Sequence, residues 1–117
     1  MAADEANEAV WFSVRCLLQH DGGFEERMTL WRALSFEAAR AEAEDESQLY
    51  GHLVGARHVG VVGSFCLAED SPGQGSELFS LRRDSPLSAE DYLSRFLLTG
   101  AEHSGLAELL GDERFRE

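Results

Sequence analysis

The sequence contains no lysine, only two cysteines and two prolines, and no apolar run long enough to cross a membrane. All ten of its basic residues are arginines, and 22 acidic residues give it a formal net charge of -12. This deficit of positive charge removes the counterion release that drives nucleic-acid binding and the attraction to anionic lipids. We therefore expect neither nucleic acid nor a membrane among the partners of this protein.

The scarcity of cysteine excludes a secreted disulfide scaffold. Cys16 and Cys66 both lie in apolar, strand-like runs, which is typical of reduced thiols buried in a cytosolic protein. The N-terminal segment MAADEANEA lacks the basic start and apolar core of a signal peptide. We expect a cytoplasmic protein with a flexible acidic tail over residues 1–9, one domain over 10–111 and a charged tail over 112–117.

Alternating apolar residues in the first third of the chain predict two strands over 10–20 and 24–34. The sequence Asp21-Gly22-Gly23 between them is typical of a hairpin turn. We prefer a three-residue loop because it sets Val14 opposite Leu30 and Cys16 opposite Met28, apolar against apolar. A bulge would shift this register by one residue.

The rest of the chain predicts two helices and two further strands. Ser35 is a suitable N-cap for a helix over 36–53. A third strand follows over 56–69, where interior glycines indicate a bulge or a close approach by another element. The turn sequence DSPGQGS precedes a fourth strand over 77–83, and Ser88 caps a second helix that ends at Gly100. The fold class is therefore α+β, in the order ββαββα. We expect a mostly antiparallel four-stranded sheet with the helices packed on one face, and a short extra C-terminal helix near 104–110.

Several short motifs resemble a family of small bacterial proteins. They are an EER sequence before a strand that ends in WRA, an acidic Ala-rich helix, GSELFS before the second helix, and YLSRF within it. Together they resemble a domain-of-unknown-function family, number forty-two eighty-eight in the common domain listing. The resemblance spans about residues 11–102 and implies a bacterial, single-domain protein without an assigned activity.

Five acids and one arginine fall within SFEAARAEAEDE, the first part of the longer predicted helix. At about 100° per residue these acids fan around the helix, whereas a metal ion needs ligands that converge. Most of them are expected to form a solvated face. Glu42, Asp45 and Glu46 could instead form an acidic docking face for a basic partner.

The sequence carries no pattern that indicates catalysis. The four histidines form no cluster, both thiols lie among apolar residues, and phosphate-binding and nucleophile-elbow motifs are absent. We accordingly assign no catalytic residue, no metal site and no cofactor.

One face of the predicted sheet is left without a helix. In the preferred register it shows Trp11, Ser13, Arg15, Leu17, Thr29, Trp31 and Ala33. Exposed tryptophans beside an arginine are typical of interface cores, so Trp11, Leu17, Trp31 and Arg15 are candidate partner-binding or dimer-interface residues. In the alternative arrangement the C-terminal segment folds over this face and buries both tryptophans within the monomer.

Two functions follow from these patterns. The first is a non-catalytic protein-interaction or regulatory module, working as a homodimer or as a partner of another, basic protein in the manner of an immunity or antitoxin-like inhibitor. The second is a small dimeric α+β enzyme or small-molecule-binding protein. Its pocket would be lined by Trp11, Trp31 and Phe79, with Arg15 or Arg32 as a polar contact and His58 or Glu77 as an acid or base.

Overall fold

The computed structural model describes residues 8–68, 70–97 and 99–102. It divides into two compact units, one ending at Leu81 and the other beginning at Arg82. Most of the predicted N-terminal tail, the predicted helix over 104–110 and the predicted C-terminal tail lie outside the described residues. The single-domain boundary at 10–111 therefore stays a prediction.

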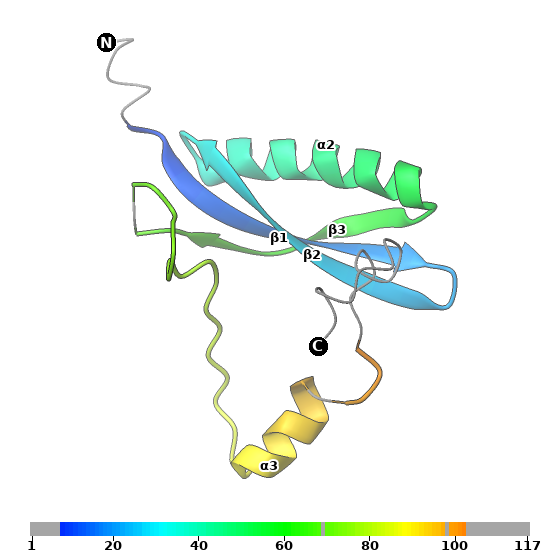
Figure 1. Ribbon diagram of the computed structural model, residues 1–117. Coiled ribbons are helices and arrows are strands. Elements are labelled where there is room, and N and C mark those ends of the chain that lie inside the picture. The colour runs from blue at the N-terminus through cyan, green and yellow to red at the C-terminus, as the bar shows by residue number, and fades with distance from the viewer. Residues whose placement is uncertain (1–7, 69, 98, 103–117) are drawn as a thin grey trace. The chain divides into compact units, whose positions relative to one another are not determined.

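The first unit is a three-stranded antiparallel sheet with one long helix. β1 (Val10–His20) lies between β2 (Gly23–Ala33) and β3 (Arg57–Cys66), in the order β2-β1-β3. Helix α2 (Phe36–Val54) runs along one face of this sheet (Figure 1). The α+β class is confirmed. The predicted fourth strand and the predicted ββαββα order are not confirmed, because residues 77–83 form no strand in the part of the chain that the structure describes.

Helix α2 begins and ends where its capping residues predict. The Ser35 hydroxyl accepts a hydrogen bond from the Ala38 N–H at 3.1 Å, and Gly55 closes the helix in the left-handed conformation. The residues that face the sheet are small, and all are buried: Ala39, Ala43, Ser47 and Gly51. Small side chains let the helix axis approach the strands closely, and the core forms where they meet Phe12, Val14, Cys16 and Leu18 of β1.

The preferred hairpin register was wrong by one residue. The loop contains two residues, Asp21 and Gly22, and β1 pairs with β2 so that Val14 faces Thr29 and Cys16 faces Arg27. Gly22 adopts a positive φ of 86°, which allows a turn this short. Because side chains alternate along a strand, the change exchanges the faces of β2. Met28 and Leu30 therefore point away from the helix, and Trp31 points toward it.

The predicted bulge in the third strand is confirmed. The pairing of β1 with β3 shifts between Arg15 and Cys16 and again between Leu17 and Leu18. These shifts break the simple alternation of β3, so Val61 packs against the core while Val59 and Val62 stay exposed.

The second unit contains a short helix, α3 (Ala89–Tyr92), continued by a π-helical turn, η1 (Leu93–Leu97). The predicted cap is confirmed, because the Ser88 hydroxyl accepts from the Asp91 N–H at 3.2 Å. The rings of Tyr92 and Phe96 lie 4.8 Å apart between centroids, and the Arg83 guanidinium lies 4.9 Å from the Phe96 centroid.

Gly51 marks the closest approach between α2 and the chain that follows it. A Cβ atom at this position would lie 2.6 Å from the Ala56 carbonyl oxygen and 3.1 Å from a Leu18 methyl. We expect Gly51→Ala to lower the free energy of unfolding by about 1–3 kcal/mol, because the overpacked backbone must move. Urea denaturation measures this loss. Gly60→Ala, where the added methyl meets nothing within 4 Å, is the matched control. Equal stability of the two variants would contradict the close packing.

Candidate interaction surface

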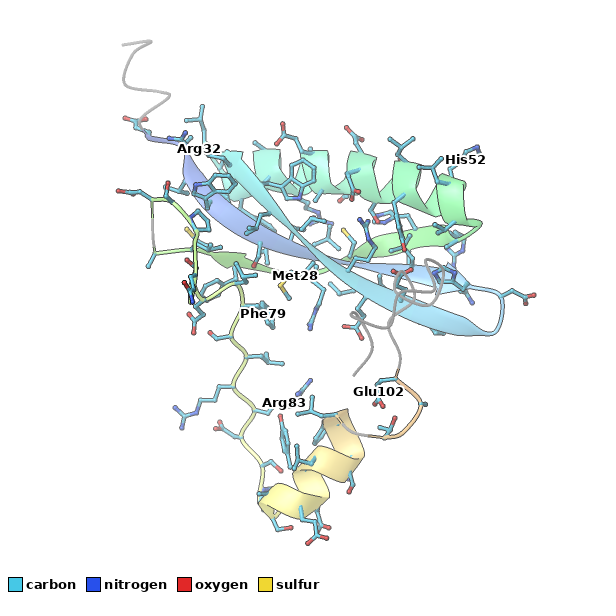
Figure 2. The ribbon with its side chains drawn as sticks, in the orientation of Figure 1. Met28, Arg32, His52, Phe79, Arg83 and Glu102 are labelled. Carbon is cyan, nitrogen blue, oxygen red and sulfur yellow. The ribbon has the colours of Figure 1, made fainter. Side chains whose placement is uncertain are left out.

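The sheet face opposite α2, here called the open face, carries the odd-numbered residues of β1 and the even-numbered residues of β2. On β1 and β2 these are Trp11, Ser13, Arg15, Leu17, Gln19, Phe24, Glu26, Met28, Leu30 and Arg32. Figure 2 shows Met28 and Phe79 on this side of the sheet, away from α2. The open face is therefore the part of the first unit that the helix leaves uncovered.

An extended segment after β3 covers part of the open face. The Ser13 hydroxyl donates a hydrogen bond to the Leu78 carbonyl, and Ser13 is buried. The Phe79 ring packs edge-on against Phe65 of β3, with centroids 6.4 Å apart. The sequence predicts a fourth strand over these residues, but the segment packs on the face of the sheet instead of forming a strand. This segment is not the C-terminal one of the alternative prediction, whose burial of both tryptophans stays a prediction.

Arg15 stands at the border of the covered part. Its guanidinium lies 4.8 Å from the Phe79 ring centroid, and its Nη1 is 3.6 Å from a Glu26 carboxylate oxygen. Its Nε is buried and has no hydrogen-bond partner among the described residues. Arg15 therefore lies on the open face and packs against Phe79, a ring that the small-molecule-binding hypothesis placed in the same pocket as Arg15.

The β2 side of the open face remains apolar and exposed. Phe24, Met28 and Leu30 have exposed fractions of 66%, 40% and 38%. The charged residues of the three strands on this face are Arg15, Arg32, Arg57 and Glu26. A chain with a net charge of -12 thus presents one face on which arginines outnumber acids. Apolar exposure of this kind is typical of an interaction site.

The four predicted interface residues do not share one face. Trp11, Arg15 and Leu17 lie on the open face and are half-buried. Trp31 lies on the helix side, where it packs against the core and donates its indole N–H to the Thr29 hydroxyl at 2.7 Å. The placement of Trp31 on the open face was therefore wrong, and the cause is the one-residue difference in register. Sequence reasoning assigned Met28 and Leu30 to the core for the same reason.

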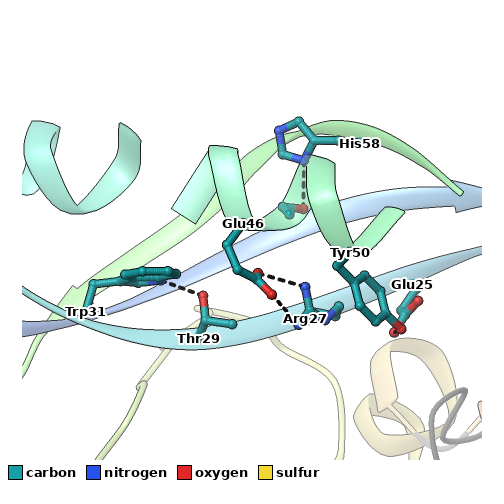
Figure 3. A network of polar contacts seen from close by, with 8 residues as sticks. Glu25, Arg27, Thr29, Trp31, Glu46, Tyr50 and His58 are labelled. Atoms are coloured by element: carbon teal, nitrogen blue, oxygen red, sulfur yellow. Dashed lines mark hydrogen bonds and ion pairs between the residues drawn. The ribbon is translucent and has the colours of Figure 1, made fainter. Parts of the chain in front are cut away.

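Glu46, one of the three residues of the predicted acidic docking face, forms an ion pair within the chain. Both carboxylate oxygens of Glu46 accept hydrogen bonds from Arg27 on β2, at 3.0 and 3.1 Å (Figure 3). This bidentate ion pair joins α2 to β2. Glu42 and Asp45 remain exposed on the outer side of α2.

The ion pair belongs to a longer polar network between α2 and the hairpin. The Arg27 guanidinium stacks 3.6 Å from the Tyr50 ring centroid, and the Tyr50 hydroxyl donates to Glu25 at 2.8 Å (Figure 3). His20 Nε2 lies 2.7 Å from the other Glu25 oxygen. Burial, and then the hydrogen bond to Glu25, raises the pKa of Tyr50 to about 12.

A second buried polar cluster lies under α2. The Ser47 hydroxyl is buried and lies 2.8 Å from His58 Nδ1. Burial raises the pKa of the Cys16 thiol, although a hydrogen bond with Ser47 opposes the rise. A protonated, buried thiol is a poor nucleophile. The cluster joins Ser47 of α2 to His58 of β3 beneath the helix.

No group of three or more potential metal ligands is present among the described residues. Within the same residues, no helix has both the length and the apolar character that crossing a membrane requires. Comparison of the chain with protein-family models, curated proteins and solved structures found no match. The resemblance to the domain-of-unknown-function family therefore stays a prediction.

The two cysteines should differ strongly in reactivity. Cys16 is 2% exposed and its thiol pKa is raised, whereas Cys66 is exposed. We expect a disulfide reagent such as Ellman's to modify one thiol per folded chain rapidly and the second only in denaturant. Cys66→Ser should remove the fast phase and leave the slow one. A fast phase that survives this substitution would show that Cys16 is accessible.

Tyr50 should make stability fall at high pH. Its pKa of about 12 in the folded chain lies above the usual value of 10, so the folded state holds the phenol proton more tightly. The stabilisation is complete below pH 10 and is lost as the pH rises toward 12. Urea unfolding at pH 8 and pH 11 should show a larger loss of stability for the natural chain than for Tyr50→Phe. Parallel losses in both proteins would contradict the contact with Glu25.

Proposed function

We propose that this protein is a non-catalytic protein-interaction module and that the open face along β2 is its contact surface. The observation that carries the proposal is the exposure of Phe24, Met28 and Leu30 at alternate positions of one strand, on a sheet face without a covering helix. The flanking arginines supply polar contacts at the rim of this surface.

The geometry separates two surfaces that the sequence hypothesis combined. Glu42 and Asp45 lie on the outside of α2, on one side of the sheet, while the open face lies on the other. A basic partner attracted by these acids would approach the helix. The open face, with its arginines and apolar side chains, favours a partner that offers apolar and acidic groups.

The alternative function, an enzyme or small-molecule-binding protein, receives less support. Trp31 lies on the helix side of the sheet and Phe79 on the open face, so these rings cannot line one pocket with Trp11. His58 contacts the buried Ser47, and Glu77 is exposed beyond the sheet. Trp31 and His58 therefore lie apart from Trp11, Arg15, Arg32 and Phe79, which share the open face.

Site-specific photo-crosslinking tests the interaction module in cells that express the full chain. We expect a photoreactive amino acid in place of Met28 to give a discrete crosslinked protein species. The matched control is the same group in place of Leu49, an apolar residue 63% exposed on α2. The mass of the product identifies the partner as a second copy or another protein. Absence of a product from position 28, or an identical pattern from both positions, would contradict the proposal.

A further inference from the structure

The hydrogen-bond pattern of β1 shows which main-chain groups of β2 face outward. In an antiparallel ladder, each residue of a central strand directs its N–H and its C=O to the same neighbouring strand. The Trp11 carbonyl accepts a hydrogen bond from Leu67 N–H, on the β3 side, at 2.8 Å. Odd-numbered residues of β1 therefore bond toward β3, and even-numbered residues bond toward β2.

The even-numbered residues of β1 face odd-numbered residues of β2, such as Arg27, Thr29 and Trp31. The even-numbered residues of β2 consequently direct their N–H and C=O groups to its outer edge. No strand pairs with this edge in the described part of the chain. These residues are Phe24, Glu26, Met28, Leu30 and Arg32.

The two edges of the sheet differ in how they could receive another strand. β3 has two register shifts and interior glycines, which twist and interrupt an edge. β2 is eleven residues long, pairs with β1 without a shift, and contains neither proline nor lysine. It thus lacks the proline, the bulges and the short length with which natural proteins block strand addition, although it carries the charged residues Glu25, Glu26, Arg27 and Arg32. Of the two edges, it is the one better able to pair.

We propose that β2 pairs in antiparallel fashion with β2 of a second copy, around a two-fold axis at Thr29, to join two three-stranded sheets into one. The inference rests on the proposed function and names the partner and the geometry of that interaction. The N–H and C=O groups at the outer edge of one β2 strand must bond to those of the other, so even-numbered residues must face even-numbered residues. This condition limits the axis to a position on a residue of β2.

The charges of β2 select one of these positions. With the axis at Thr29, Glu26 faces Arg32 of the second copy and Met28 faces Leu30, and two-fold symmetry forms each pair twice. With the axis at Met28, Glu26 would face Leu30. With the axis at Leu30, Met28 would face Arg32. Among the even-numbered residues, which lie on the open face, only the register centred on Thr29 matches opposite charges and places Met28 against Leu30.

The same strand supplies both members of each pair, which is why a second copy is the partner. The paired strands would place Met28 and Leu30 of both copies in one apolar cluster on the open face. That cluster would be continuous across the axis, where the side chains of Met28 and Leu30 would contact one another and cover part of their exposed surface.

A charge-swap experiment on the full chain tests the register. Glu26→Arg alone sets arginine against Arg32 twice, and Arg32→Glu alone sets two acids together twice, so each should weaken the homodimer at least tenfold. Mixing the two variants restores an opposite-charge pair at both positions, and we expect the heterodimer to form preferentially. Native mass spectrometry of differently tagged copies, with sedimentation velocity, measures both effects. Arg57→Glu, a charge reversal on β3 of the same face, is the control and should leave the dimer intact.

A disulfide trap provides an independent test. Residues on the two-fold axis form a non-hydrogen-bonded pair with Cα atoms roughly 4.5 Å apart, within the range that a disulfide spans. In a chain carrying Cys16→Ala and Cys66→Ser, Thr29→Cys should oxidise to a covalent dimer. Leu30→Cys should not, because the two copies of Leu30 do not face each other.

The outcomes separate the two proposals. A dimer that neither single charge reversal weakens would overturn the β2 pairing, as would a chain that is monomeric at every concentration. In either case, a crosslink from position 28 to a different protein would leave the interaction module in place. Loss of that crosslink would overturn the module itself.

Discussion

The turn at Asp21 and Gly22 determines which side chains of β2 meet the helix and which meet solvent. A loop of two residues makes His20 face Gly23, and this pairing is carried without interruption to Val10 and Ala33. Side chains alternate along a strand, so a loop longer by one residue would exchange the two faces of β2. The positive φ of Gly22 is the local requirement for this short loop. The residues that β2 contributes to the candidate surface depend on it.

The register also explains why α2 carries its acids without destabilising the sheet contact. Arg27 is directed under the helix, where it forms the ion pair with Glu46 and stacks on Tyr50. Had Arg27 faced the open side, Glu46 would have been a half-buried acid without a partner, which costs free energy. The remaining acids of the helix point outward. The small residues Ala39, Ala43, Ser47 and Gly51 supply the contact surface. Tight packing and a dense acidic face thus occupy opposite sides of one helix.

Patterns within single elements were predictable from the sequence, and the relations between elements were less so. The strands, the caps at Ser35 and Ser88 and the bulge in β3 follow from local rules of alternation, side-chain capping and glycine content. The register was misjudged because matching Val14 with Leu30 satisfied the apolar pattern without regard to the turn. The segment around Phe79 was misjudged because an extended, apolar stretch packs on a sheet face as readily as it joins an edge. Local sequence does not distinguish these two outcomes.

Electrostatics makes self-association of such an acidic chain physically reasonable. The outward-facing acids of α2 lie on the side of the sheet opposite the open face, and at physiological ionic strength charges are screened over about 8 Å. Paired strands lie closer than this, at about 4.8 Å, so the charges adjacent to the β2 edge act nearly unscreened. On the open face those charges are Glu26 and Arg32, which have opposite signs. A strong net charge would keep copies apart in most orientations, and antiparallel pairing at β2 is the approach in which the nearest charges attract. The acidic composition thereby favours one mode of contact over the many that a neutral chain would permit.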